Sequence, residues 1–205
     1  MAGKAVSPSS ATRPPRAARG PLPRAVRIIG GQWKRTKLPV ADKPGLRPTP
    51  DRVRETLFNW LDHDLGGRRC VDVFAGTGAL GFEAASRGAA EVLLVEQDPD
   101  LVAQLRAIQQ RLEATTVKVE RANGLSVLGR LAPGSVDLVF LDPPFDADLF
   151  GKALAAAAAA LAPGGLVYLE APAAWEEAAL APYGLQRLRH LRAGAVHAHL
   201  LQRTA

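Results

Sequence analysis

The chain has 205 residues with 26 Lys and Arg against 20 Asp and Glu, a net charge of +6, and 47% hydrophobic residues. This is enough for one domain with a real core. Its single cysteine, Cys70, excludes an internal disulfide, no apolar run is long enough to span a membrane, and the basic N-terminus lacks the apolar segment of a secretory signal. We therefore expect a cytoplasmic protein. Its one Cys and four His show no zinc-ligand spacing, so no metal is expected.

The charge is distributed unevenly along the chain. Residues 1–54 hold 13 Lys and Arg and 2 Asp and Glu, a net charge of +11, whereas residues 55–205 hold 13 and 18, a net charge of −5. A basic front on an acidic body indicates a surface for a polyanion, with nucleic acid the first candidate. Residues 1–24 have no apolar periodicity, and we expect a disordered basic tail there. Composition leaves open whether the tail binds nucleic acid.

Residues 25–62 form a second region in front of the main domain, residues 63–205. The stretch RIIGGQWKRTKLPV, residues 27–40, predicts a short hairpin: apolar residues, two glycines, and then alternating basic and apolar residues. Its basic residues are candidates for contact with an RNA backbone, the alternative being a solvated strand edge protected by lysines. These residues are Lys34, Arg35 and Lys37.

A helix is predicted after the proline-rich loop that follows this hairpin. Thr49 suits the N-cap and Pro50 the first helical position. Apolar residues then recur on one face of the helix, which Arg52 and Arg54 are not expected to share.

Strands and helices alternate along the main domain. Strands are predicted at residues 70–74, 91–96, 117–121, 136–141 and 166–170, and helices at residues 79–87, 99–112, 125–131 and 148–161. Such repeats predict an α/β fold with a largely parallel, doubly wound sheet, in which ligands bind beyond the carboxyl ends of the strands. Residues 185–190 and 195–202 predict a terminal antiparallel hairpin.

The first of these strands runs into DVFAGTGALG, residues 72–81, which matches G-x-G-x-x-G. Gly76 and Gly78 would let the backbone approach a ligand, and Glu96, 20 residues after Gly76, lies where a carboxylate can bind ribose. This pattern alone also permits an NAD-type dinucleotide. Asp72 favours S-adenosylmethionine instead, because a carboxylate there repels a pyrophosphate and attracts an ammonium or a sulfonium.

The stretch FLDPPF, residues 140–145, ends the fourth strand beside the glycine turn. Asp142 and the carbonyl of Pro143 can accept the two hydrogens of an exocyclic amine, and Phe145 can stack on the base. This grip would point the nitrogen lone pair at an electrophile, and Asp142 could then accept the proton that the nitrogen loses. The structural alternative is a strand-ending turn with Phe145 in the core.

For other polar residues near the strand ends, a structural role is an alternative to a role in the site. Asn123 could bind an adenine or a ribose, but it could equally cap the next helix. Glu170 could reach the mouth of the site, although we expect a surface carboxylate. His197 and His199 share a strand face, and without a third ligand they are expected to be ordinary strand histidines.

Several of these stretches carry a resemblance to known enzymes. DVFAGTGALGFEAASRGA, VEQDP and DPPF resemble the class I S-adenosylmethionine-dependent methyltransferases that modify exocyclic amines. With RIIGGQWKRTKLPV and GLRPTPDRVRETLFNWL in front, residues 27–203 resemble the RsmD family of bacterial 16S rRNA guanine-N2 methyltransferases. The resemblance implies a seven-stranded Rossmann-like sheet, S-adenosylmethionine as cofactor, and guanine 966, in the usual bacterial numbering, as the target in an assembling 30S particle. We expect a monomer.

The resemblance also assigns roles by position. Asp72, Gly76 and Gly78 would line the cofactor, Glu96 would hold its ribose and Asn123 would approach its adenine. Asp142, Pro143 and Phe145 would hold the guanine, with Arg47, Thr49, Arg52 and Arg54 near the entrance. The alternatives are an amino-group methyltransferase acting on DNA adenine, another rRNA base or a protein glutamine, a non-catalytic RNA-binding module, and an NAD oxidoreductase.

Overall fold

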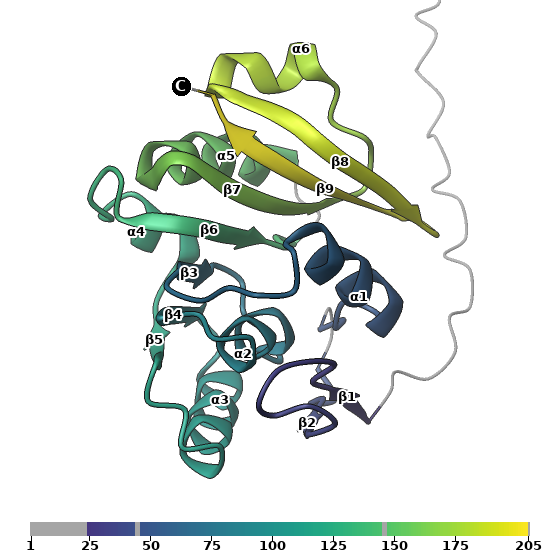
Figure 1. Cartoon of the computed structure of the whole chain (residues 1–205), viewed down its shortest axis with the longest axis vertical. Coiled ribbons are helices and arrows are strands. Elements are labelled where there is room, and N and C mark those ends of the chain that lie inside the picture. The colour runs from purple at the N-terminus through teal and green to yellow at the C-terminus, as the bar shows by residue number, and fades with distance from the viewer. Residues whose placement is uncertain (1–23, 44–45, 145–146, 205) are drawn as a thin grey trace, which may run out of the picture.

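A seven-stranded sheet runs through the centre of the protein, as the computed structural model in Figure 1 shows for residues 24–43, 46–144 and 147–204. The strands lie in the order β5-β4-β3-β6-β7-β9-β8. They are β3 (Arg69–Asp72), β4 (Glu91–Glu96), β5 (Val117–Arg121), β6 (Val136–Leu141), β7 (Leu161–Ala171), β8 (Leu185–Ala193) and β9 (Val196–Arg203). The first five are parallel, and β9 and β8 form an antiparallel hairpin beside β7. The predicted fold is therefore confirmed. The strand order reverses between β3 and β6, which is where ligands bind in such sheets.

Helices cover both faces of this sheet. They are α1 (Asp51–Trp60), α2 (Ala79–Ser86), α3 (Pro99–Arg111), α4 (Gly124–Leu128), α5 (Ala147–Ala160), α6 (Glu177–Leu180) and the short 3₁₀ helix η1 (Ala181–Tyr183). Alternate strand residues divide the core: Phe140 packs with α1, α2 and α3, whereas Leu141 packs with α4 and α5. Within the described ranges, no helix combines the length and apolar character needed to cross a membrane.

The N-terminal region docks on the helix that follows the glycine turn. β1 (Ala25–Arg27) and β2 (Lys37–Pro39) pair antiparallel, which confirms the predicted hairpin. In the connecting loop the backbone N–H groups of Ile29 and Gly30 donate to the Glu83 carboxylate on α2 over 2.7 and 2.8 Å. Gly31 has φ of 74°, and a Cβ there would lie 1.8 Å from the Ser86 carbonyl oxygen. The hairpin is thus fixed to α2 by contacts that need glycine.

The same region shares a core with the sheet. Val26 and Leu38 of the hairpin and Phe58 of α1 belong to one buried cluster with Phe140 and Tyr168. The proposed boundary after residue 62 remains a prediction. The expected disordered tail, residues 1–24, lies outside the described residues except for Arg24.

The structure corrects one predicted helix start. The N-cap position of α1 is Pro50, which makes no side-chain hydrogen bond, and not Thr49. Thr49 is buried instead, and its side chain lowers the pKa of the Glu170 carboxylate. Asn123 caps α4, the alternative that the sequence left open, by accepting from the backbone of Ser126, and Asp98 caps α3 by accepting from the backbone of Leu101.

Candidate active site

A cavity of about 680 Å³ opens at the carboxyl ends of the parallel strands. Its walls are the glycine turn after β3, the ends of β4, β6 and β7, the start of α4, the loop before α1 and the tip of the β8–β9 hairpin. This volume is within the range of small-molecule sites. The cavity therefore lies where the strand order reverses, as the fold predicts.

Four carboxylates reach this cavity from four strands: Asp72 from β3, Glu96 from β4, Asp142 from the end of β6 and Glu170 from β7. Side chains alternate between the faces of a strand, so each acid shares the face of residues two positions before it. Because Phe140 pairs with Tyr168 on the α1–α3 face, the residues two positions later, Asp142 and Glu170, come to adjacent places. The expectation that Glu170 is a surface carboxylate is wrong, since it is only 4% exposed.

The β3–β4 side of the cavity, at the ends of these two strands, is organised by backbone amides. Glu96 accepts hydrogen bonds from the N–H groups of Gly76, Gln97 and Asp98 over 2.9, 2.8 and 2.9 Å. Gly78 has φ of 76°, and a Cβ there would lie 2.6 Å from a methyl carbon of Leu105. The tight turn after β3 therefore requires glycine and fixes the orientation of the Glu96 carboxylate.

Asp72 is the most buried acid on this side. It is 2% exposed, and its carboxylate accepts a hydrogen bond from the Gly81 N–H group over 3.0 Å. Burial raises the pKa of Asp72 to about 7; the Gly81 hydrogen bond opposes this, and the charges of Glu96 and Glu170 add to it. None of the described residues forms an ion pair with Asp72, so a cation bound in the cavity would stabilise its charged form. This environment fits a ligand that carries an ammonium and a sulfonium.

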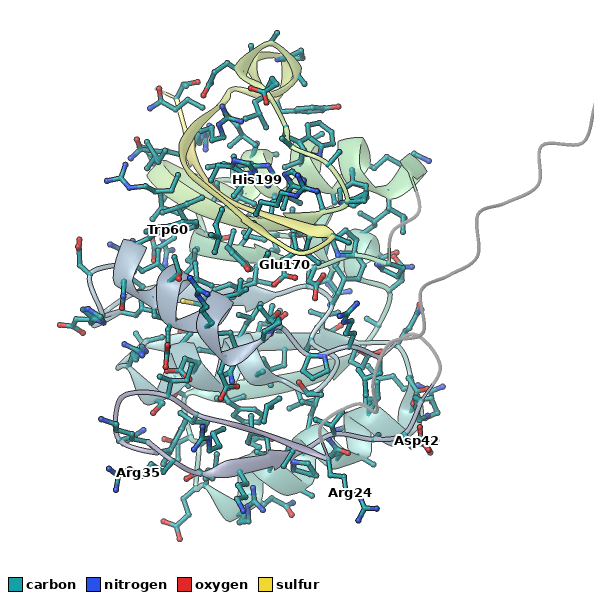
Figure 2. All side chains as sticks on the ribbon, turned by 90° about the vertical axis from the view of Figure 1, so that its right-hand side faces the viewer. Arg24, Arg35, Asp42, Trp60, Glu170 and His199 are labelled. Atoms are coloured by element: carbon teal, nitrogen blue, oxygen red, sulfur yellow. The ribbon has the colours of Figure 1, made fainter. Side chains whose placement is uncertain are left out.

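The β6–β7 side of the cavity, at the ends of these two strands, is organised by side chains. The Tyr168 hydroxyl donates to Glu170 over 2.8 Å. Burial raises the pKa of Glu170, while hydrogen bonds from Thr49 and Tyr168 and the charge of Arg47 lower it. Figure 2 shows Glu170 near the centre of the molecule, beneath the β8–β9 hairpin.

Asp142 is half-buried on the same wall, followed by the buried Pro143. Burial raises the pKa of Asp142 well above its ordinary value, and the charges of Glu170 and Asp72 raise it further. No residue within the described ranges donates a hydrogen bond to this carboxylate. Phe145, the predicted stacking residue, lies outside the described residues.

Five of the six basic residues predicted to meet substrate are exposed: Lys34, Arg35, Lys37, Arg47 and Arg52. Arg47 lies on the cavity wall, whereas the first three lie on the β1–β2 hairpin, from which Arg35 points outward in Figure 2. The sixth, Arg54, is fully buried between Asp51 and Glu83, 2.6 and 3.5 Å from their carboxylates. The predicted contact of Arg54 with substrate is therefore wrong: this arginine joins α1 to α2.

Two other predicted groups of residues can now be placed. Asn123 caps α4 and also lines the cavity, so its contact with an adenine stays a prediction. The rings of His190, His197 and His199 stack on one another at the far edge of the sheet. In the part of the chain that the structure describes, no group of three or more His, Cys, Asp and Glu is placed to hold a metal.

Comparisons with known proteins find similarity to a protein family and to methyltransferases. The family model described as Conserved hypothetical protein 95 matches residues 26–202. Ribosomal RNA small subunit methyltransferase D of Escherichia coli (strain K12) is 51% identical over 120 residues, which is 58% of this chain and 60% of that relative's length. The protein of the same name from Haemophilus influenzae is 43% identical over 150 residues, 71% of this chain and 78% of the relative.

Solved structures that are similar to this chain are also described as methyltransferases. A putative methyltransferase, yhhF, from Escherichia coli superposes with a TM-score of 0.75 at 38% identity, over 88% of this chain and 99% of that chain. A putative methylase, HI0767, from Haemophilus influenzae superposes with a TM-score of 0.73 at 34% identity, over the same shares.

Proposed function

Because the chain belongs to the RsmD family of methyltransferases, we propose that it transfers a methyl group from S-adenosylmethionine to N2 of a guanine in 16S rRNA. The observation that carries the proposal is the open carboxylate of Asp142 beside a cavity whose other wall holds Asp72 and Glu96. The proposed target is guanine 966, in the 30S particle during its assembly in the cytoplasm. A monomer suffices, since one chain supplies all four carboxylates of the cavity.

The cofactor would be held by residues at the ends of β3, β4 and β5. Glu96, oriented by three backbone amides, would accept the ribose hydroxyls, and Asp72 would lie toward the cationic part of the ligand. Gly76 and Gly78 would allow close approach of the backbone, and Asn123 would meet the adenine. S-adenosylmethionine supplies a methyl group on a positively charged sulfur.

The base would be held on the other side of the cavity. Asp142 and the Pro143 carbonyl would accept the two N2 hydrogens, which directs the nitrogen lone pair at the methyl group. To take up a methyl group, N2 would have to lose one proton. Asp142 is the acceptor, and its raised pKa favours this transfer. Phe145 would stack on the flipped base.

The RNA backbone would be bound away from this chemistry. Lys34, Arg35 and Lys37 on the β1–β2 hairpin would contact phosphates, with Arg47 and Arg52 closer to the cavity. These contacts would position the RNA and would weaken as salt rises.

The test uses purified protein, methyl-labelled S-adenosylmethionine, and both 30S particles and free 16S rRNA that lack the modification. We expect label to be recovered as N2-methylguanosine with the wild-type protein and to be lost with Asp142→Ala. Absence of label in either RNA, with cofactor binding intact, would rule out the rRNA substrate. Full activity of the variant would rule out the grip by Asp142.

A further inference from the structure

Glu170 is a carboxylate of the cavity to which the mechanism above gives no role. It lies on β7, the direct neighbour of β6, and lines the cavity although it is almost completely buried. Leu141 and Leu169 are paired in the register of the two strands, so Asp142 and Glu170 occupy the next place on each strand. Neighbouring strands lie about 4.8 Å apart, which brings the two carboxylates side by side at one wall.

The neighbours of this carboxylate orient it without neutralising it. The Tyr168 hydroxyl donates to it over 2.8 Å, and the side chain of Thr49 lowers its pKa. None of the described residues forms an ion pair with Glu170, although Arg47 stands near enough to favour its charged form. An ionised carboxylate has about four lone-pair positions, so acceptor capacity remains for a ligand. Burying such a group is costly, and buried carboxylates in a cleft often mark functional sites.

The position of Glu170 in the sheet indicates which ligand it would contact. In the sheet order β6 separates β7 from β3 and β4, whose ends hold the residues proposed for the cofactor. Glu170 is therefore on the far side of Asp142 from that ligand, where the remainder of the base would lie.

The Watson–Crick edge of guanine presents two neighbouring donor groups, the N2 amine and the N1–H group. Two neighbouring carboxylates match this edge. Adenine has an acceptor at N1, which would repel a carboxylate and leave it without a partner, and sites built to bind an N–H group reject such analogues strongly. Resting on the proposed function, we propose that Glu170 accepts the N1–H hydrogen bond of the target guanine while Asp142 holds N2. Glu170 would thus make the site selective for guanine.

The experiment pairs one protein change with one base change. Glu170→Gln keeps the shape of the side chain but can present an amide N–H group where the carboxylate oxygen was. The RNA is 16S rRNA ligated so that 2-aminopurine replaces the guanine that the wild-type protein methylates; this base keeps the 2-amino group and lacks N1–H. On the guanine RNA we expect Glu170→Gln to lower kcat/KM by roughly 10- to 100-fold. On the 2-aminopurine RNA, which the wild-type protein should methylate more slowly, the variant should cause no further loss.

Two controls separate recognition from folding. Tyr168→Phe removes the hydroxyl that orients Glu170 and keeps the carboxylate, so it should give a smaller loss with the same dependence on the base. In Glu170→Gln the cofactor Kd, measured by calorimetry, should be unchanged, and the Tm should be no lower than that of the wild type, because the variant buries no ionisable group at this position. Equal losses on both RNAs, or no loss on either, would overturn the role of Glu170 while leaving the proposed function intact. If the wild-type protein methylates no guanine, the proposed function fails and the role of Glu170 fails with it.

Discussion

The side of the cavity proposed for the cofactor, at the ends of β3 and β4, differs from the side proposed for the substrate, at the ends of β6 and β7, in the groups that donate hydrogen bonds to its carboxylates. Glu96 accepts from three backbone N–H groups and Asp72 from one. On the other side Glu170 accepts from the Tyr168 hydroxyl, and no described residue donates to Asp142. The backbone thus fixes one pair of acids in advance, whereas the other pair keeps acceptor capacity for the donors of a base.

The largest expected effect concerns the charge buried on the cofactor side. Burial raises the pKa of Asp72 from 3.8 to about 7. The stability that protonated Asp72 contributes is fully present below about pH 4, the unfolded pKa, and is lost as the pH rises to about 7. Asp72→Asn cannot ionise and can still accept from Gly81, so at pH 8 we expect this variant to be more stable than the wild type, by up to roughly 4 kcal/mol.

Urea denaturation at pH 4.5 and pH 8 measures this difference, which should be much smaller at the lower pH. The same variant should bind S-adenosylmethionine more weakly at pH 8, because it lacks the charge that the ligand stabilises. If the variant is no more stable than the wild type at pH 8, then burying the charged Asp72 carboxylate does not lower the free energy of unfolding.

The division into two sides can be tested directly through cofactor affinity. We expect Glu96→Ala to raise the Kd for S-adenosylmethionine by roughly 10- to 100-fold, since it removes hydrogen bonds to a charged acceptor. Asp142→Ala should change this Kd by less than about threefold, because Asp142 is assigned to the base. Isothermal titration calorimetry gives both values. Equal losses would mean that one ligand uses both sides.

A smaller effect on stability is expected from substitution in the glycine turn, where Gly67 provides a matched control for Gly78. Gly78 and Gly67 both have φ of 76°, but a Cβ at Gly78 would meet Leu105 and Phe82 at 2.6 and 2.7 Å, whereas at Gly67 it would meet no described atom within 4 Å. Gly67→Ala should therefore lower the free energy of unfolding by about 1–2 kcal/mol through backbone strain alone. Gly78→Ala should add a packing cost of about 1–2 kcal/mol. If the two variants lose the same stability in urea denaturation, the side chains around the turn rearrange freely.

The sequence predicted most of the fold because its signals are local. Alternating apolar runs, glycine and proline stops and the cap at Asn123 each involve residues close in the chain. β7 is the exception, since it begins at Leu161 and not at Leu166. Pro163 lies within it, where the pairing with β6 shifts in register between Val136 and Leu138. The four-residue helix α6 was missed because it is too short to show a periodic pattern.

The two residues whose burial was predicted wrongly, Arg54 and Glu170, are surrounded by residues that are distant in the sequence. Arg54 is three and four residues from Leu57 and Phe58, so it shares the buried face of α1. Its partner Glu83, however, is 29 residues away in the chain. An arginine with no visible partner is predicted to be exposed. Glu170 could have been assigned by strand parity from Tyr168. Its burial, however, depends on Thr49 and on the β8–β9 hairpin, which only the folded chain brings together.

The smallest effect concerns RNA binding far from the cavity. Replacing Lys34 and Arg35 by alanine should lower the slope of log affinity against log salt by about 1 per residue, whatever the target base, because phosphate contacts carry no sequence information. Lys152→Ala, which removes an exposed charge from α5 on the other side of the sheet, is the control. Titration of labelled 16S rRNA at several salt concentrations measures the slopes. An equal change in the control would assign the effect to net charge. A change confined to the hairpin variant, with the preference for guanine over 2-aminopurine kept, would separate backbone binding on the hairpin from base recognition by Asp142 and Glu170.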